Sequence, residues 1–308
     1  MKVYHSLADY EIGRRTVATI GTFDGLHIGH RTILQRLKTA AAEVGGESLL
    51  ISFHPHPRLV LFPENNPLRL LHTQPEKIAM LREIGLDKVL FIPFTREFSR
   101  LPSRAFIQDI LVQGVGLHRI VIGYDHRFGK NRTGGIEELR AYAAEGGYQV
   151  EEIPAQSIDD AKVSSTKIRK ALLAGEVATA HRYLGYAYGF SGTVVHGEKK
   201  GRQLGYPTAN LLPEDPLKLI PGNGIYFVEA FLGEEKLYGM MSIGHKPTVG
   251  TFDRGYEVHL FDFNRDIYGQ PLRVQFLEYI RGEVKFDSLE DLMEAMAGDE
   301  AFCRARMG

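Results

Sequence analysis

The sequence contains almost no cysteine, and its opening residues lead us to expect no apolar leader. Its one cysteine, Cys303, has no second thiol with which to form an internal disulfide bond. The opening residues, MKVYHSLADYEIGRR, lack the continuous apolar core of a secretory signal peptide. Both absences argue against a secreted, disulfide-stabilised protein, and they predict a cytoplasmic location.

Long apolar runs and an excess of charge are also missing. A run such as VLFIPF, residues 89–94, is far shorter than the ~20 apolar residues of a transmembrane helix. The 37 lysine and arginine residues nearly balance the 38 aspartate and glutamate residues, so no overall field attracts nucleic acid or a membrane surface. Neither is therefore an expected partner, whereas anionic small molecules are compatible with this balance.

The first part of the chain has a regular alternation of patterns. A length of 308 residues with a hydrophobic fraction of 44% predicts two ordinary domains. Short apolar or β-branched runs predict strands at TVATI, SLLISF, KVLFIPF, RIVIGY and YQVEEIP. Between them, amphipathic segments predict helices at RTILQRLKTAAAEV, PEKIAMLREIG, SRAFIQDILVQG and IEELRAYAAEG. This βαβ alternation indicates an α/β domain with a parallel sheet.

The second part reads as strands with turns and no helix between them. The runs FSGTVVHG, GIYFVEAFLG, KLYGMMSIG, YEVHLFDF and LRVQFLEYI predict an antiparallel barrel or sandwich. One closing helix is expected after a cap at Ser288, with Leu289, Leu292 and Met293 at helical spacing. The pattern changes near residues 185–189, which places the predicted boundary between domains 1–186 and 187–308.

The stretch IGTFDGLHIGH, residues 20–30, follows the first expected strand and opens the first expected helix. Free backbone N–H groups and the helix dipole at such a place favour an anion, and phosphate is the natural example. Gly21, Gly25 and Gly29 allow the backbone to approach a ligand closely. His27 and His30 can donate hydrogen bonds to phosphate oxygens as charge develops during transfer. The alternative interpretation is a glycine turn with a capping histidine.

Four sequence blocks in this half carry a resemblance to a known family. They are IGTFDGLHIGH, SFHPHPR at 52–58, GYDHRFGKNRTG at 123–134 and VSSTKIRKAL at 163–172. The first resembles the HxGH nucleotidyltransferase superfamily, which includes class I aminoacyl-tRNA synthetases. Together the blocks resemble the bacterial bifunctional riboflavin kinase/FAD synthetase family. The resemblance implies a Rossmann-like nucleotidyltransferase domain in which His27 and His30 are catalytic. It also implies that the phosphates of ATP bind to Gly21, Thr22, Phe23, Asp24, Gly25 and Gly29.

The block SSTKIR combines helix-capping residues with a cation. Its serines can cap a helix, and Thr166 and Arg169 lie one turn apart, so both can reach ATP phosphates. A well-capped helix without any ligand is the alternative. In the family this segment works on ATP, which implies that Ser164, Ser165, Thr166 and Arg169 bind it here.

Two further blocks are compared with metal and phosphate motifs. GYDHRFGKN is not a P-loop, because the spacing to Gly-Lys is one residue too long and Asn131 replaces the serine or threonine. HPHP lacks a cysteine or carboxylate at familiar zinc spacing, which argues against a structural metal. The resemblance instead implies that both blocks form a flavin and nucleotide pocket, with a polar loop as the alternative for the first. The implied pocket residues are His54, Pro55, Arg58, Asp125, Phe128 and Gly129.

The barrel half carries GRQLGYPTANL at 201–211 and EVHLFDFNRDIYG at 257–269. Both resemble the riboflavin kinase module of the same family, which implies that the second domain is an antiparallel β-barrel with a C-terminal helix. The resemblance makes Thr208 the hydroxyl ligand of an ATP-bound magnesium ion, and it places Asn210, Gly201, Gly205 and Pro207 in the kinase ATP site. Magnesium commonly keeps few protein ligands beside phosphates. A turn that enters a strand is the alternative for YPTANL.

Glu257 matches the carboxylate that the family uses as general base toward the ribityl 5′-hydroxyl group, and a solvated strand residue is the alternative. DFNRDIYG is not a calcium loop, because its sixth position is Ile267 and its twelfth is Arg273. The stretch His245–Val249 departs from the family, which usually has an Asn-Pro-Thr-Phe-like run there. GEVKFDSL departs as well, because a proline usually precedes its glutamate.

The residues support phosphate chemistry at the first site, and the resemblance implies a bifunctional enzyme that uses magnesium and ATP. One domain would convert riboflavin to FMN and ADP, and the other would convert FMN and ATP to FAD and pyrophosphate. An aminoacyl-tRNA synthetase-like enzyme is a rival, but YEVHLFDFNRD is mixed in charge rather than basic. A flavin-storage module without catalysis is a second rival, against which His27, Thr208 and Glu257 argue. Riboflavin as the substrate follows from the resemblance alone.

Overall fold

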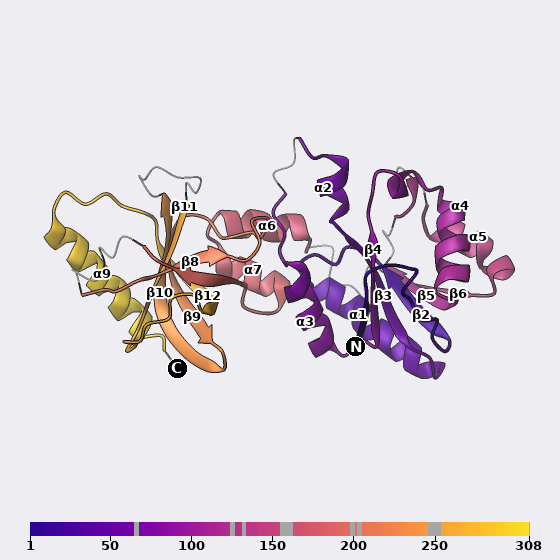
Figure 1. The fold of residues 1–308 in the computed structure, drawn as a ribbon, viewed down its shortest axis with the longest axis horizontal. Coiled ribbons are helices and arrows are strands. Elements are labelled where there is room, and N and C mark those ends of the chain that lie inside the picture. Colours follow the sequence, from indigo (N-terminus) through magenta and orange to yellow (C-terminus); the bar gives the residue numbers. More distant parts are fainter. Residues whose placement is uncertain are drawn as a thin grey trace. The chain divides into compact units, whose positions relative to one another are not determined.

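The computed structural model describes residues 1–64, 68–123, 127–130, 134–154, 163–197, 201, 205–245 and 254–307. The chain divides into two compact units, Met1–Ser164 and Ser165–Gly308. Figure 1 shows the elements of both, and each unit is treated separately below. Asp125 and residues 246–249 of the His245–Val249 stretch lie outside the described residues, as does the side chain of His245.

The first unit is built on a parallel sheet whose described strands follow the order β1-β4-β3-β2-β5-β6. The central strand β2 is buried along its whole length, as expected for a strand that helices cover on both faces. The strand bounds are β1 Lys2–Tyr4, β2 Thr16–Ile20, β3 Ser48–His54, β4 Lys88–Pro93, β5 Leu117–Gly123 and β6 Gln149–Ile153. The predicted parallel α/β domain is confirmed, and β1 is an additional edge strand that the sequence pattern did not indicate.

Helices pack on both faces of this sheet (Figure 1). Successive strand residues face opposite ways, so Val17 packs in the cluster with α1 and α3, whereas Ala18 packs in the cluster with η2 and α5. The segment SRAFIQDILVQG begins as α4 and continues as a π-helix, η2, rather than as one α-helix. The helix bounds are α1 Ile28–Glu43, α2 Pro57–Leu61, α3 Gln74–Ile84, η1 Phe98–Arg100, α4 Ser103–Ala105, η2 Phe106–Gly114 and α5 Ile136–Gly146.

The order of the strands locates the binding edge of the sheet. From β2 the chain adds β3 and β4 on one side, and it then returns to add β5 and β6 on the other side. In an open parallel sheet, ligands bind outside the carboxyl ends of the strands at the point where this direction reverses. That point lies between β2 and β5, where the loop of the IGTFDGLHIGH stretch begins.

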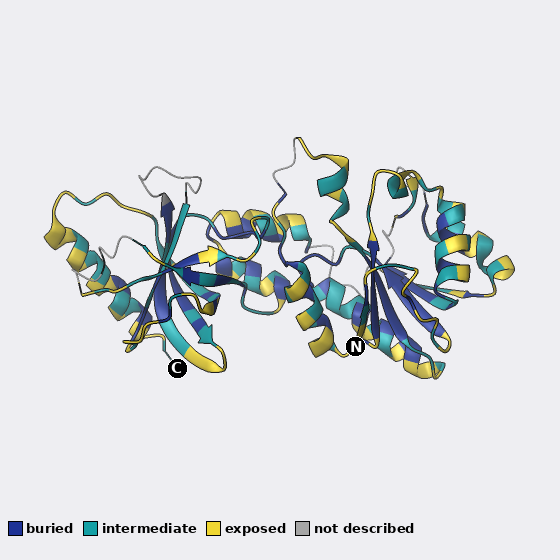
Figure 2. Ribbon diagram, in the orientation of Figure 1, coloured by how far each residue is buried: buried dark blue, intermediate teal, exposed yellow. Residues whose placement is uncertain are grey.

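The second unit contains a closed antiparallel barrel in the order β10-β11-β8-β7-β12-β9. Of the two architectures expected from the sequence, the barrel is therefore the correct one. Alternate residues of β7 are buried, as expected for a strand with one face toward the core. Figure 2 shows buried residues along the strands of the barrel. The strand bounds are β7 Gly189–Val195, β8 Ala209–Pro213, β9 Gly224–Leu232, β10 Glu235–His245, β11 Arg254–Leu260 and β12 Pro271–Arg281.

Two short helices, α6 Ser165–Leu173 and α7 Val177–Leu184, belong to the barrel unit. The Gly222 N–H donates to the Leu172 carbonyl at 2.9 Å, and α7 packs against β12. The apolar faces of both helices, which include Ile168, Leu172 and Leu184, are buried. The compact unit therefore begins at residue 165, whereas the boundary at 186 stays a prediction about where the two activities separate.

The closing helix is α9 Leu289–Arg304. Ser288 caps it by accepting a hydrogen bond from the Asp291 N–H, as predicted. Its second half packs on the barrel, where Cys303 is fully buried beside Phe227. Its first turns are open to solvent, and Leu289 is 54% exposed. Apolar spacing therefore located the helix but not the part of it that is buried.

Candidate active sites

The first candidate site is the loop between β2 and α1. The Gly21 N–H donates to the Ile51 carbonyl at 3.0 Å, which ties the loop to the neighbouring strand β3. Phe23, Gly25 and Leu26 have positive φ angles of 46°, 94° and 38°. Such angles are unfavourable for phenylalanine and leucine, so the surrounding contacts must hold this backbone in place.

The two histidines of the loop lie against each other. His27 is the N-cap of α1, and its Nδ1 accepts a hydrogen bond from the His30 N–H at 3.3 Å. The two rings stack with their centroids 3.6 Å apart, and the ring of Phe23 lies 4.7 Å from that of His30. Because Nδ1 of His27 is an acceptor, the proton of the neutral ring is on Nε2, which is then a hydrogen-bond donor.

Burial keeps this histidine pair neutral. Burial lowers the pKa of His27 to about 4, although the charge of Asp24 opposes the shift. The pKa of His30 lies well below its ordinary value because of burial, with further lowering by the nearby charges of His27, Lys77 and His72. The Nδ1 atom of His30 has no hydrogen-bond partner among the described residues. At neutral pH the loop therefore offers neutral donors to an incoming anion.

This neutral state has a measurable consequence for folding. Below pH 6.5 the unfolded chain protonates residue 27, whereas the folded ring resists protonation down to about pH 4. His27 therefore lowers the free energy of unfolding as the pH falls through this window, by up to about 3 kcal/mol. His27→Asn keeps a capping oxygen but has no such proton. We therefore expect wild type to lose stability relative to His27→Asn as the pH falls from 6.5 to 4, so that the unfolding free energy of wild type minus that of the variant decreases.

Calorimetric unfolding of the whole chain at several pH values measures this difference. The unfolding transition that shifts in His27→Asn is the one that belongs to the first unit. A difference that stays constant across the window would mean that residue 27 titrates alike in both states.

Asp24 lies in the same loop but faces inward. It is 2% exposed, and its carboxylate accepts hydrogen bonds from the N–H groups of Leu71, at 3.1 and 3.2 Å, and His72, at 3.1 Å. Among the other residues expected to contact phosphate, Gly29 is buried in the first turn of α1, and Thr22 is half-buried. The carboxylate of Asp24 thus ties the loop to the segment that leads into α3.

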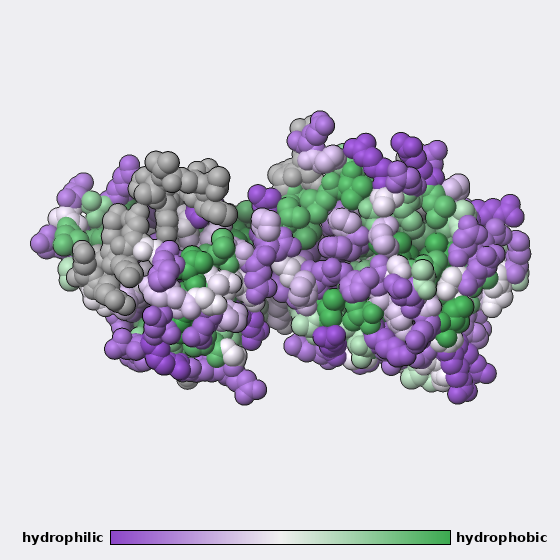
Figure 3. Space-filling view, viewed as in Figure 1, coloured by the Kyte–Doolittle hydropathy of each residue, from purple (hydrophilic) through white to green (hydrophobic). Residues whose placement is uncertain are grey.

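Other predicted residues lie at the same edge of the sheet. His54 ends β3, and His54, Pro55 and Arg58 are all exposed. Beside them, Leu61 and Phe62 are 42% and 60% exposed, and Figure 3 shows apolar side chains on the surface over α2. Sequence reasoning had not included Leu61 and Phe62, although their apolar character next to HPHP is the signal that could have indicated them.

The block after β5 is only partly described. Phe128 is buried and packs against Phe106 with ring centroids 5.6 Å apart. Gly129 has φ +71°, and a Cβ atom there would lie 2.9 Å from the Cβ of Ser103. Both residues therefore hold the loop against α4 and η2. Asp125, the third residue predicted here, is outside the described residues.

The SSTKIR block forms the start of α6. Ser164 precedes the helix, Ser165 begins it, and Ile168 is buried. Thr166 is exposed and Arg169 is half-buried. The predicted helix is confirmed.

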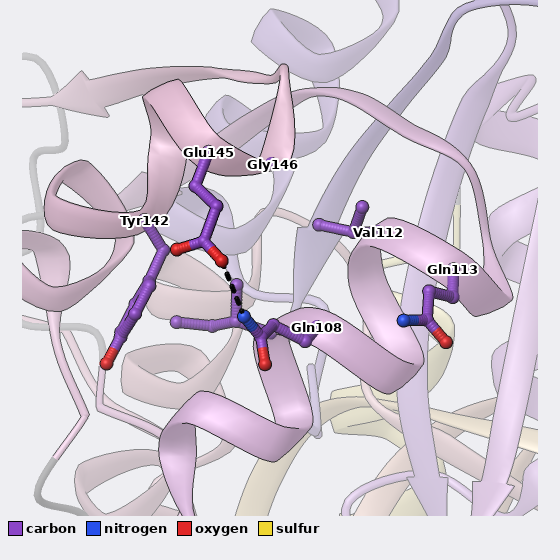
Figure 4. A pocket seen from close by; sticks show the side chains of 7 residues that line it. Gln108, Val112, Gln113, Tyr142, Glu145 and Gly146 are labelled. Carbon is purple, nitrogen blue, oxygen red and sulfur yellow. Dashed lines mark hydrogen bonds between the residues drawn. The ribbon is translucent and has the colours of Figure 1, made fainter.

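A pocket of the first unit lies away from these residues. It measures about 240 Å³ and is lined by Ile107, Gln108, Val112, Gln113, Tyr142, Glu145 and Gly146 of η2 and α5 (Figure 4). The C-terminal ends of these two elements lead into β5 and β6 and therefore lie toward the amino ends of the strands. Because ligands of such sheets bind at the carboxyl ends, we assign this pocket no part in catalysis.

The second candidate site is formed where β8 and β11 pair. Glu257 and Asn210 are direct cross-strand partners. The Thr208 hydroxyl group donates to Oε2 of Glu257 at 3.0 Å. Asn210 is buried, and Glu257 and Thr208 are half-buried. The barrel therefore brings together three of the residues predicted for the kinase reaction, which are 49 residues apart at the widest.

The segment before β8 is shaped by glycines and backbone contacts. Gly201 accepts a hydrogen bond from the Tyr206 N–H at 2.9 Å, and exposed Gly205 has φ +82°. The Pro207 carbonyl lies 2.8 Å from Nδ1 of His259. A Cβ atom at Gly197 would lie 2.2 Å from Nδ2 of Asn210, so a larger residue there would displace the Asn210 amide.

A pocket of about 150 Å³ opens beside Thr208. Its lining residues come from β7, β8 and the two residues before it, β11 and the loop after β11: Val194, Pro207, Thr208, Ala209, Val258, Leu260, Phe263, Asn264, Arg265, Asp266, Ile267 and Tyr268. The loop residues 263–268 were not predicted as site residues, although they lie in the stretch EVHLFDFNRDIYG that resembles the riboflavin kinase module. Its mixture of aromatic and charged side chains was the available signal.

The described residues of the two candidate sites include no cluster of metal-binding protein side chains. Within the described ranges, no group of three or more histidine, cysteine, aspartate or glutamate side chains could hold an ion. The donors at the second site are instead the hydroxyl, amide and carboxylate oxygens of Thr208, Asn210 and Glu257. Hard oxygen donors of this kind suit a divalent cation that takes its remaining ligands from phosphate and water.

Two family models match the chain in tandem. One, described as FAD synthetase, matches residues 9–167, and the other, described as riboflavin kinase, matches residues 184–307. The first therefore contains the histidine loop, and the second contains Thr208, Asn210 and Glu257. No described helix has the length and apolar content needed to cross a membrane.

Relatives match over nearly the whole chain. Bifunctional riboflavin kinase/FMN adenylyltransferases from Pseudomonas fluorescens and Escherichia coli are 38% and 37% identical, covering 95% of this chain and 93% of each relative. A solved structure described as a macrolide-efflux protein from Streptococcus pneumoniae matches with a TM-score of 0.88 at 30% identity, covering 98% of both chains. That description concerns the other protein, and the shared feature is the fold.

Proposed function

The chain belongs to the family of bifunctional riboflavin kinases/FMN adenylyltransferases, and we propose that two separate groups of its residues carry the two reactions. The enzyme phosphorylates riboflavin with ATP to give FMN, and it adenylylates FMN with ATP to give FAD. We assign adenylylation to the loop that carries His27 and His30, and phosphorylation to Thr208, Asn210 and Glu257. The predicted cytoplasmic location stays a prediction.

Phosphorylation would use Glu257 as general base. The carboxylate takes the proton of the ribityl 5′-hydroxyl group as that oxygen bonds to the γ-phosphorus, and the bond from the γ-phosphorus to the ADP oxygen breaks. The observation that carries this assignment is the 3.0 Å hydrogen bond from Thr208, which orients one oxygen of Glu257. Thr208 itself lines the pocket. The nearby Gly201, Gly205 and Pro207 shape the segment over which ATP would lie.

We propose that Mg²⁺ accompanies ATP at this site. The Thr208 hydroxyl oxygen would be its protein ligand, with Asn210 and Glu257 as neighbours. Bound there, Mg²⁺ would neutralise the charge of the phosphates. The protein residues themselves orient the phosphates and remove the proton from riboflavin.

Adenylylation would use the neutral donors of the histidine loop. An FMN phosphate oxygen attacks the α-phosphorus of ATP, and the bond to the leaving pyrophosphate breaks. Nε2–H of His27 and the ring of His30 would stabilise the charge that develops on the phosphate oxygens. The resemblance adds Ser164, Ser165, Thr166 and Arg169 as further ATP contacts. The flavin would use His54, Pro55 and Arg58, with the exposed apolar surface of Leu61 and Phe62 suited to its flat ring system.

Cutting the chain tests whether the two activities are separable. We expect a fragment of residues 187–308 to make FMN from riboflavin and ATP, and residues 1–186 to convert FMN, but not riboflavin, to FAD. A fragment of residues 165–308 should also make FMN and should melt at a higher temperature than 187–308. It retains α6 and α7, and each buried leucine in them contributes about 1.5–3 kcal/mol.

Product chromatography and thermal melting by circular dichroism measure these outcomes. The uncut enzyme is the control for both activities. If 165–308 is folded but makes no FMN, the kinase reaction depends on residues 1–164 and our assignment of independent groups is wrong.

A further inference from the structure

A buried lysine lies beneath the histidine loop. Lys77, on α3, is only 8% exposed. Its Nζ donates a hydrogen bond to the Thr22 carbonyl oxygen at 2.7 Å. Lysine is almost never buried without a specific partner, and the partner here is the backbone of the loop that the FAD-forming reaction would use.

The contact between α3 and the loop runs in both directions. Asp24 of the loop accepts hydrogen bonds from the N–H groups of Leu71 and His72. Thr73, the residue after His72, caps α3 in a capping box with Glu76. The Asp24 carboxylate of the loop thus holds the residues before α3, and the Lys77 ammonium group of α3 holds the loop.

The position of this ammonium group matters for the direction of the loop backbone. In a trans peptide the C=O and N–H groups point to opposite sides, so holding the Thr22 carbonyl toward Lys77 turns the Phe23 N–H away from it. Phe23 and Leu26 also have positive φ angles, which persist only where surrounding contacts enforce them. The Lys77 contact is therefore placed to hold a strained loop in one conformation.

The charge of Lys77 also acts on the histidine pair. Burial lowers the pKa of Lys77, and the neighbouring charge of Asp24 opposes this shift. The same ammonium group is one of the charges that lower the pKa of His30, together with those of His27 and His72. Lys77 therefore both anchors the loop and helps to keep the His30 ring neutral.

We propose that Lys77 is a positioning residue for FAD formation: its ammonium group holds the Thr22 carbonyl and thereby sets the loop that presents His27 and His30 to the ATP phosphates. This inference rests on the proposed role of that loop in adenylylation. Lys77 itself does not touch the reacting atoms; it acts through Thr22 and through the charge that it places near His30.

Lys77→Met in the full-length enzyme removes the charge and the donor at similar volume. We expect kcat for FAD formation from supplied FMN to fall by roughly tenfold to a hundredfold, as for a displaced reacting group. FMN formation in the same sample should be unchanged. The pKa of His30 should rise once the positive charge is gone, so the acidic limb of the FAD-forming rate should move to higher pH. Lys77→Arg should retain more activity than Lys77→Met.

Lys88→Met is the matched control. Lys88 is also a buried lysine of the first unit, 4% exposed, but it begins β4 at the opposite edge of the sheet and pairs with Glu47 at 3.0 Å. Its loss should lower the melting temperature and leave both kcat for FAD formation and the pH profile as in wild type. If Lys77→Met does not fold, Lys77→Gln replaces it, with the same expectation.

Folded Lys77→Met or Lys77→Gln with wild-type kcat and an unshifted acidic limb overturns the proposal. The proposal is also overturned if kcat falls without a shift of the acidic limb and falls equally in Lys88→Met. Lys77 would then contribute to fold stability alone. Parallel assay of a variant lacking both histidines separates the two levels of inference. If the variant that lacks both histidines makes FAD at the wild-type rate, the proposed role of the loop in adenylylation is wrong, whatever the result for Lys77.

Discussion

Replacing both His27 and His30 with alanine is expected to abolish FAD formation while FMN continues to form and accumulates. The stacked rings supply the hydrogen-bond donors at the loop, and both belong to the unit that the FAD synthetase model covers. The loss of one such preorganised donor typically lowers a rate by about a hundredfold to a thousandfold. Losing both should remove measurable FAD, because the loop then offers only its backbone N–H groups to phosphate.

Chromatography of the products from riboflavin and ATP measures both reactions in one sample. The control is His118→Ala, which removes a histidine near the start of β5, at the opposite edge of the same sheet, and should leave FAD output unchanged. The double substitution also removes the His27 cap of α1, so the melting temperature of the variant must be measured as well. A folded double variant that makes FAD at the wild-type rate would end the assignment of the loop.

The period of apolar residues was enough to predict most of the fold. Short runs of apolar or β-branched residues such as Thr16–Ile20 mark strands that helices cover on both faces, and β2 is buried throughout. Closure of the barrel was not decided by the sequence, because it depends on β9 pairing with both β10 and β12. The π-helix of η2 was missed for a different reason, since its hydrogen-bond spacing leaves no mark in the apolar pattern.

In the candidate sites too, residues that are close in the chain could be predicted, whereas contacts between residues far apart in the chain could not. The histidine loop could be predicted because strand, glycine turn and helix follow one another directly in the chain. Lys77 could not, because it lies 55 residues from Thr22 in a segment where a lysine reads as a solvated helix residue. Likewise, the pocket residues 263–268 meet Thr208 only once the barrel has formed. Distant pairings of this kind require the fold before they can be recognised.

Glu257→Gln should remove riboflavin phosphorylation and leave adenylylation intact. The amide keeps the shape of the carboxylate, and its oxygen can still accept the hydrogen bond that the Thr208 hydroxyl group donates. What it lacks is the ability to take the proton of the 5′-hydroxyl group. We therefore expect FMN formation to fall by roughly a hundredfold to ten-thousandfold, the usual contribution of general acid–base catalysis. Because the geometry is kept, this loss reports proton transfer rather than packing.

Supplied FMN should still become FAD in Glu257→Gln, since that reaction is assigned to the other unit, and this provides an internal measure of intact protein. Glu278→Gln is the matched control: Glu278 is a carboxylate of barrel strand β12 that pairs with Arg306 at 2.8 Å, and its loss should leave both rates unchanged. Initial rates of FMN formation with saturating ATP distinguish the roles. Normal phosphorylation by Glu257→Gln would mean that Glu257 only orients Thr208, and the base would have to be sought among the other residues around the pocket, beginning with Asp266.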